Sequence, residues 1–234
     1  MTIKKLQKTL RSLANPEIAE HALRFMKAGK GEYGYGDNFL GIRISTLRTQ
    51  LKKNRTLAIE DTLTLLSSKY HEERWFALQL LVWKFQKGTA EERKGIYDLY
   101  IKNIEYVNNW DLVDCSAPKI TGPYLENRNR RILYRLAKSK SIWERRIAVM
   151  STFHFIRSYD FDDTLQISTL LLNDKEDLIH KAVGWMLREV GNRDKITEKK
   201  FLKKHYRDMP RTMLRYAIEK FPEGERKSYL RGEI

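Results

Sequence analysis

The chain has 234 residues, which fits one domain of ordinary size or an array of short repeats. Hydrophobic residues make up 41% of it and prolines number only 5, so its composition argues against a disordered protein. Its 45 Lys and Arg residues outnumber its 30 Asp and Glu residues, and the net charge of +15 argues against a protein-binding scaffold. Such a charge indicates a polyanionic partner, with nucleic acid favoured over an anionic membrane.

The positive charge is concentrated at the two ends of the sequence. Residues 1–54 hold 11 Lys and Arg against 4 Asp and Glu, a net of +7, and residues 195–231 hold 12 against 5, again +7. The sequence between them is close to neutral. This distribution predicts that both ends of the protein bind double-stranded DNA, and that the central part of the protein inspects the DNA between them.

The sequence also indicates a cellular location. No stretch approaches the roughly 18 apolar residues of a membrane span, and the first residues lack the apolar core of a signal peptide. The single cysteine, Cys115, rules out an internal disulfide and suits a reducing compartment. We therefore expect a monomer in the cytoplasm, of bacterial type and associated with the nucleoid, with no membrane partner.

In chain order, the pattern is helical nearly throughout. Apolar residues recur at spacings of three and four, and strand-like alternation is hard to find. Helices are predicted to begin after Asn15-Pro16, Asn54 and Asn127, where Asn or Pro supplies capping chemistry. The glycine-rich segment Gly29–Asp37 lacks the ending of a phosphate-binding loop and favours a surface loop, with a DNA-touching loop as the alternative.

Four similar segments, with a fifth from Asn109 that falls between the first two, indicate internal repeats. They begin at residues 74, 109, 145, 180 and 210, so the steps are 35, 36, 35 and 30 residues. This period is typical of paired-helix repeats of the HEAT type. The sequence therefore predicts an all-α protein, a superhelical solenoid of HEAT-like helical repeats that forms a single domain over residues 1–234.

The repeat register predicts which side chains line the concave groove of such a solenoid. In each segment the second residue and the one four positions later should face the same way. The second residues are Trp75, Trp110, Arg146, Lys181 and Arg211, and those four later are Gln79, Asp114, Met150, Trp185 and Arg215. The alternative is that some of the tryptophans belong to the core, where tryptophan usually lies.

Trp110 and Asp114 are the most informative pair in this register. An aromatic ring and a carboxylate on one helical face suit a protein that holds a cationic base and attacks the bond behind it. The five histidines show no metal-ligand spacing, and nucleophile-elbow, Walker and zinc-finger motifs are absent. Chemistry would therefore depend on Asp, Trp, Arg and Tyr, without a metal or cofactor.

Four motifs in this order resemble the AlkD-like DNA alkylation-repair family, and the likeness spans about residues 15–220. They are Phe39-Leu-Gly-Ile-Arg43, Trp110-Asp-x-Val-Asp114, Ile142-Trp-x-Arg-Arg146 and Ile179-x-Lys181-Ala-x-Gly-Trp185-x-Leu-Arg188-Glu. The resemblance implies a HEAT-like solenoid whose basic concave face wraps duplex DNA, and a DNA glycosylase that excises alkylated purines in base excision repair.

The resemblance also implies roles for individual residues. Asp114 matches the catalytic carboxylate, Arg146 the position beside it, and Trp110 and Trp185 the aromatic walls. Arg43 and Arg188 match positions near the DNA backbone. The repeat register adds Trp75, Lys181, Arg211 and Arg215 as further DNA-binding residues. One position departs from the family pattern, since Phe25 stands where the family often has tyrosine.

These residues predict hydrolysis of the N-glycosidic bond of cationic N3- or N7-alkylpurines. Such a base is already a good leaving group, so one carboxylate suffices where neutral glycosides need two. Ionised Asp114 would stabilise positive charge on the deoxyribose and orient a water molecule. The alternative is a non-catalytic HEAT-repeat protein that binds damaged or branched DNA, which needs only the basic groove.

Overall fold

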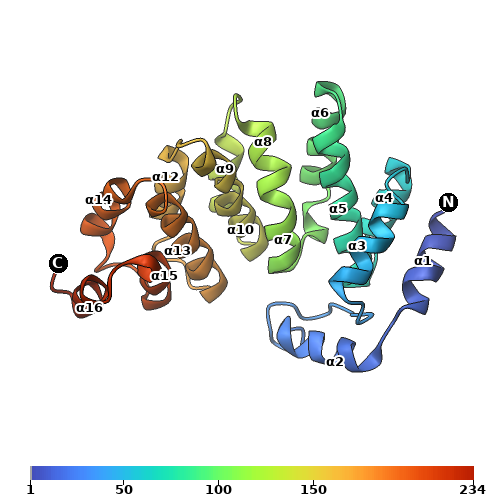
Figure 1. Cartoon of the computed structure of the whole chain (residues 1–234), viewed down its shortest axis with the longest axis horizontal. Helices are drawn as coiled ribbons and strands as arrows, with labels where there is room; N and C mark the ends of the chain where they lie inside the picture. Colours follow the sequence, from blue (N-terminus) through green and yellow to red (C-terminus); the bar gives the residue numbers. More distant parts are fainter. Residues whose placement is uncertain (1) are drawn as a thin grey trace. The chain divides into compact units, whose positions relative to one another are not determined.

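The computed structural model describes residues 2–234, and helices account for nearly all of its regular structure (Figure 1). Within these residues, extended segments pair only in an isolated parallel bridge between Asn38 and Tyr70. This confirms the predicted all-α class. No helix in the described part of the chain combines the length and apolar character needed to cross a membrane. The chain divides into two compact units, Met1–Ser116 and Ala117–Ile234, which we describe in turn.

The first unit is organised around its longest helix, α5. Its helices are α1 (Ile3–Ser12), α2 (Pro16–Phe25), α3 (Ile44–Lys53), α4 (Ile59–Leu66), α5 (His71–Lys87), α6 (Ala90–Lys102), the 3₁₀ helix η1 (Ile104–Tyr106) and α7 (Trp110–Ser116). Helix α5 packs against α3, α4, α6 and α7, and α4, α5 and α6 can be followed side by side in Figure 1. Because neighbours surround α5, every residue from 71 to 78 is buried.

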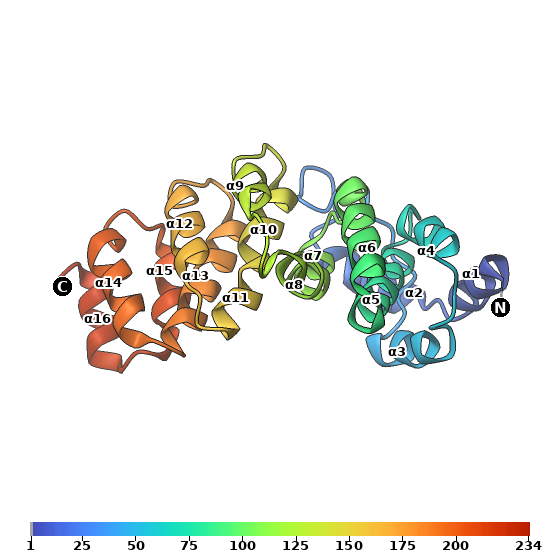
Figure 2. The ribbon, with the colours of Figure 1, turned by 90° about the horizontal axis from the view of Figure 1, so that it is seen from above.

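The second unit is organised around α13. Its helices are η2 (Ala117–Lys119), α8 (Thr121–Leu125), α9 (Arg131–Ala137), α10 (Ile142–Ser151), α11 (Phe153–Arg157), α12 (Asp162–Leu170), α13 (Asp177–Gly191), α14 (Lys195–His205), α15 (Arg211–Ala217), η3 (Ile218–Lys220) and α16 (Glu223–Arg231). Helix α13 packs against α10, α12, α14 and α15 (Figure 2). Gly184 allows the close approach to α15, since a β-carbon there would meet the carbonyl of Met213 and the side chain of Tyr216.

The five predicted repeat segments fall on five helices, α5, α7, α10, α13 and α15. Within the first unit α5 packs on α7, and within the second α13 packs on both α10 and α15. The segments are therefore equivalent helices of successive helical repeats, as their period indicated. The single domain predicted over residues 1–234 stays a prediction.

One predicted helix start is confirmed and two are wrong. Asn15 caps α2, because its side chain accepts a hydrogen bond from the backbone N–H of Ile18, and Pro16 is the first helical residue. Asn54 instead ends α3, and the next helix begins at Ile59. The helix predicted after Asn127 begins at Arg131. Asparagine occurs at both ends of helices, so it marks a boundary more reliably than it marks a start.

Candidate nucleic-acid site

Trp110 and Asp114 lie one turn apart on α7, and both side chains are partly exposed. The intervening Leu112 and Val113 are fully buried and fix the opposite side of the helix in the core. Helix α7 begins where Asn109 accepts a hydrogen bond from the backbone N–H of Trp110 at 2.8 Å. The shared, accessible face predicted for the tryptophan and the carboxylate is therefore present on this helix.

An aromatic surface continues from Trp110 onto α2. The rings of Phe25 and Trp110 meet edge to face with centroids 6.0 Å apart, and His21 stacks on Phe25 at 6.3 Å. Phe25 is 60% exposed, which is high for so large an apolar side chain. Such rings present π faces that attract a cation or a base. Phenylalanine supplies this surface without the hydroxyl group of tyrosine.

Beneath this surface, a buried histidine links α7 to the glycine-rich loop. His71, the first residue of α5, is only 4% exposed. Its Nδ1 lies 2.7 Å from Asp37 Oδ2 and its Nε2 lies 2.9 Å from Asp111 Oδ2. Asp37 also accepts a hydrogen bond from Arg74 Nη2 at 2.7 Å. Asp111 immediately follows Trp110, so this chain of contacts holds the N-terminus of α7.

The two carboxylates keep His71 charged. Burial alone would lower the pKa of His71, but the charges and hydrogen bonds of Asp111 and Asp37 outweigh it and raise the pKa to about 9. Burial likewise opposes the charge on Asp37, yet His71 and Arg74 together hold the pKa of that carboxyl below its ordinary value. At neutral pH the imidazolium donates from both ring nitrogens, one to each carboxylate.

The glycine-rich segment predicted as a surface loop is anchored by this network. Asp37 ends the segment and reaches His71 and Arg74. Gly34 packs so closely that an added β-carbon would lie 2.7 Å from the carbonyl of Met26 and 3.2 Å from Asn109 Nδ2. The backbone of the loop therefore packs closely against Asn109, the residue before α7.

Glu72, the second residue of α5, fixes the backbone segment that leads to Arg43. Its buried carboxylate accepts hydrogen bonds from three successive backbone N–H groups, those of Leu40, Gly41 and Ile42, at 2.9, 2.7 and 3.3 Å. Arg43 follows directly, stands at the N-terminus of α3 and is exposed. A rigid backbone thus presents an accessible cation, as expected for a residue near DNA phosphates.

In the second unit, Trp185 is the partly exposed tryptophan of the predicted site. It is partly exposed on α13, its Nε1 donates to Glu189 Oε1 at 3.3 Å, and its ring centroid lies 6.2 Å from that of Phe153. On the same helix, Lys181 pairs with Asp177 at 2.7 Å and Arg188 pairs with Glu219. Both cations are therefore held in place by carboxylates, which a phosphate could replace as partners.

The two predicted cations on α15 are exposed. Arg215 extends from the middle of the helix, and Arg211 donates from Nη1 to the backbone carbonyl of Leu230 at 2.5 Å. Their accessibility agrees with the expectation from the repeat register.

For Trp75 and Arg146, the expectation of an exposed groove position is wrong. Trp75 is 6% exposed, because α5 is enclosed by its neighbours, and it lines a cavity of about 140 Å³ together with Phe39 and His71. Arg146 is 4% exposed, and its Nη1 donates to the backbone carbonyl of Leu178 at 2.6 Å. Met150, from the same register, is also buried. The register identified equivalent helices but overestimated how much of α5 and α10 reaches solvent.

The network around α5 was missing from the sequence-based prediction. Its signal was the run His71-Glu72-Glu73-Arg74, four ionisable residues at a helix start, all of them buried.

Within residues 2–234, no group of three or more His, Cys, Asp or Glu side chains is arranged to hold a metal ion. The surfaces described above present a carboxylate, aromatic rings and cations.

Comparisons with known proteins agree with this description. A sequence model of the family described as DNA alkylation repair enzyme matches residues 6–221. A solved structure described as a predicted DNA alkylation repair enzyme from Enterococcus faecalis has 18% sequence identity, with a TM-score of 0.68 over 90% of this chain and 97% of that one, and so shares its fold. The search of curated proteins gave no match. Since the family match covers nearly the whole sequence, the chain belongs to the family of DNA alkylation repair enzymes.

Proposed function

We propose that the protein is a DNA glycosylase that hydrolyses the N-glycosidic bond of cationic N3- and N7-alkylpurines in duplex DNA. The observation that carries this proposal is the accessible face of α7, on which Trp110 and Asp114 stand one turn apart above a buried, hydrogen-bonded support. Membership of a DNA alkylation repair family supports the substrate class.

The reaction needs little proton chemistry. A purine alkylated at N3 or N7 already carries positive charge, so it leaves without protonation by a general acid. As the bond to the base breaks, positive charge develops on the deoxyribose. Ionised Asp114 stabilises that charge and orients the water molecule that adds to the sugar carbon. This is hydrolysis by side chains and water, so the proposal includes no cofactor.

The aromatic side chains hold the cationic nucleotide. The faces of Trp110 and Phe25 on the first unit and of Trp185 on the second attract a cation, and each such contact contributes about 0.5–2 kcal/mol. They also favour a cationic base over a neutral one of the same shape. The position of Phe25 beside Trp110 gives the first unit a continuous aromatic surface.

Surface cations bind the phosphates of the duplex. Arg43, Arg211 and Arg215 are exposed, and Lys181 and Arg188 are held in ion pairs near the surface. Buried Trp75 does not serve as a direct DNA contact in this proposal, and buried Arg146 acts by supporting its unit. We propose that the protein acts as a monomer on DNA in the bacterial cytoplasm, associated with the nucleoid.

The test is release of free base from duplex DNA treated with a methylating agent. We expect release of 7-methylguanine and 3-methyladenine by the wild-type protein. Asp114→Asn keeps the shape and removes the charge, so release should fall by about 100-fold or more, as for loss of one preorganised electrostatic group. Asp98→Asn, at an exposed carboxylate on α6, is the matched control and should retain full activity.

Two outcomes separate the competing functions, and a folding control accompanies them. Near-full activity of Asp114→Asn would disprove the catalytic role of this carboxylate. DNA binding by the wild-type protein without any base release would favour the non-catalytic DNA-binding alternative. A circular dichroism spectrum of Asp114→Asn that matches the wild type shows that lost activity is not a result of unfolding.

A further inference from the structure

The ring of Trp185 depends on its neighbours for its orientation. Trp185 is partly exposed on α13, between the buried residues Gly184 and Met186. The outer torsion of a tryptophan side chain is broad, so the helix alone does not fix the plane of the indole. A cation is attracted to the face of the ring and not to its edge. Binding of a cationic base by Trp185 therefore depends on contacts that hold the indole in one orientation.

Two contacts hold this indole. On one side, the ring of Phe153 on α11 lies with its centroid 6.2 Å from that of Trp185 and with its plane at 47°. At the nitrogen, Trp185 Nε1 donates a hydrogen bond to Glu189 Oε1 at 3.3 Å. Glu189 stands one turn after Trp185 on α13, and because helical side chains lean towards the N-terminus, it reaches back towards the indole. One contact at the ring and one at the nitrogen together fix its plane.

Glu189 is itself held by Arg193. Arg193 Nη1 lies 2.9 Å from Glu189 Oε2, and it also donates to the backbone carbonyl of Glu189 at 2.9 Å. The side chains of Arg193 and Glu189 are only 22% and 18% exposed, so solvent competes little for this pair. The guanidinium carbon of Arg193 lies 5.9 Å from the ring centroid of Phe153. The contacts thus form a closed ring within the second unit, through Trp185, Glu189, Arg193 and Phe153.

The place of Glu189 in α13 gives its carboxylate no favourable role in the helix itself. Glu189 lies in the last turn, two residues before the end of the helix at Gly191, where the negative end of the helix dipole disfavours an acid. Arg193 would stabilise this end without the acid, through its hydrogen bond to the backbone carbonyl. The indole N–H of Trp185 is the contact that gives a reason for an acceptor at this position.

We propose that Glu189 is a positioning residue, which holds the indole of Trp185 with its face towards the cationic base. This proposal rests on the glycosylase function proposed above. Because Glu189 acts here as a hydrogen-bond acceptor, an amide oxygen at the same position should replace its carboxylate. Glu189→Gln keeps such an oxygen, whereas Glu189→Leu removes the acceptor and keeps a good helix former.

The first measurement follows the indole in the free protein, without DNA. In proton–nitrogen correlation NMR spectra, the indole signal that disappears in Trp185→Phe is assigned to Trp185. In Glu189→Leu this signal should move upfield and exchange faster with solvent, because its hydrogen bond to a carboxylate is lost. In Glu189→Gln it should stay in slow exchange. The signals of the other tryptophans, among them Trp110, should not move.

The second measurement is single-turnover release of 7-methylguanine from methylated duplex DNA. Glu189→Leu should slow release by about tenfold, as for loss of one cation–π contact, and Glu189→Gln should slow it by less than about threefold. The affinity of both variants for undamaged duplex should change by less than about twofold, because phosphate contacts dominate it. Circular dichroism spectra that match the wild type show that the variants are folded.

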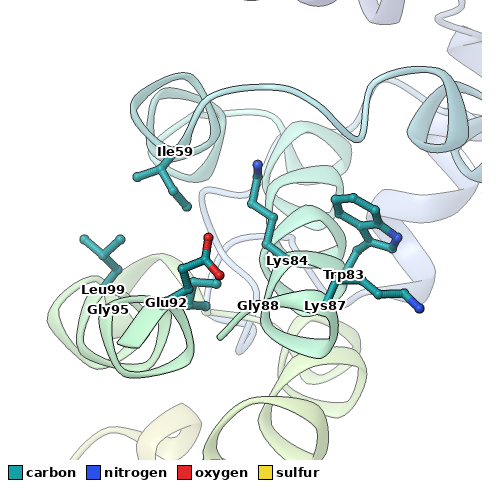
Figure 3. Close-up of a pocket in the computed structure, with 9 residues that line it drawn as sticks. Ile59, Trp83, Lys84, Lys87, Gly88, Glu92, Gly95 and Leu99 are labelled. Atoms are coloured by element: carbon teal, nitrogen blue, oxygen red, sulfur yellow. The ribbon is translucent and has the colours of Figure 1, made fainter. Parts of the chain in front are cut away.

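Asp98→Leu is the matched control. Asp98 pairs with Lys94 at 2.6 Å on α6, and these two residues are four positions apart, as are Glu189 and Arg193. Asp98 also lies outside the cleft of about 500 Å³ that α6 forms with α4 and α5 (Figure 3). Loss of this ion pair should therefore leave the Trp185 signal and the release of base unchanged.

An unmoved Trp185 signal in Glu189→Leu would overturn the proposal, and so would unchanged release in a variant whose signal does move. Equal losses of release in Glu189→Gln and Glu189→Leu would also overturn it, since they would assign the effect to the charge of Glu189 and not to its hydrogen bond. If the wild-type protein releases no base, the proposed glycosylase function fails, and the NMR comparison still decides whether Glu189 holds the ring.

Discussion

Replacement of His71 by glutamine should remove a stability contribution that depends on pH. The side chain is buried between Asp37 and Asp111, whose charges raise the pKa of His71 from 6.5 to about 9. A change of this size corresponds to about 3 kcal/mol of protonation-linked stability. Because the pKa is higher in the folded state, this stability is fully present below pH 6.5 and is lost as the pH rises towards about 9.

The assay is urea unfolding of the wild type and His71→Gln at a series of pH values from about 6 to about 10. The free energy of unfolding of the variant should be lower by about 3 kcal/mol near pH 6, and the difference should shrink steadily as the pH approaches 9. His21→Gln, at an exposed histidine of α2, is the matched control and should cost less than about 0.5 kcal/mol throughout.

A constant difference between wild type and His71→Gln across this range would refute the reasoning. It would mean that the imidazole acts through packing and not through its charge. The same variant also tests the support of α7, since Asp111 loses its charged partner. We expect base release from methylated DNA to fall more than binding to undamaged DNA, because the network positions Trp110 and Asp114 and leaves the exposed cations untouched.

Three further predictions concern DNA, the lesion and the second unit. Binding to duplex DNA should be independent of sequence. With about six phosphate contacts, its affinity should fall by about a thousandfold between about 50 and 200 mM salt. An affinity that does not change with salt in a filter-binding assay would exclude a nucleic-acid partner. The neutral bases uracil and hypoxanthine should be released poorly. Trp110→Ala and Trp185→Ala should each slow release of 7-methylguanine, as followed by chromatography of free bases, because an aromatic face attracts a cationic base. Equal cleavage of uracil-containing and methylated duplexes would mean that a general acid operates. Glu198 is 2% exposed, and burial raises its pKa to about 8, so the folded protein should lose stability as the pH rises from about 4.5 to about 8. Glu198→Gln should therefore gain stability on the order of a few kcal/mol at pH 8 relative to the wild type, and an unchanged melting temperature there would contradict the assignment.

The sequence was sufficient to predict features that depend on local spacing. The four-residue interval between Trp110 and Asp114 placed both on one face of a helix, and the helix and its accessible face are present. The repeat period likewise identified five equivalent helices, because each repeat must present the same faces to its neighbours.

Features that depend on contacts between distant segments were not predictable in this way. His71 meets Asp37 across 34 positions and Asp111 across 40, so no window of local sequence contains the network. The burial of Trp75 has a similar cause, since periodicity shows which residues share a face but not how many neighbouring helices cover that face. Helix α5 is covered on several sides, and this depends on the arrangement of α3, α4, α6 and α7.

The first turn of α5 has a consequence for the order in which the protein can fold. Besides the contacts of His71, Glu72 and Arg74, Glu73 receives hydrogen bonds from Gln7 and Arg11 of α1. Most partners of these buried charges therefore precede α5 in the chain and emerge from the ribosome before it does. When α5 emerges, its charged turn meets counter-groups that are already available, while Asp111 arrives later and completes the bridge to α7. A protein that lacked α1 would leave the buried carboxylate of Glu73 without its only cationic partner within residues 2–234, Arg11, and with the hydroxyl group of Ser68 as its donor, which is destabilising. The residues before α5 are thus a folding requirement of the helix that supports the site.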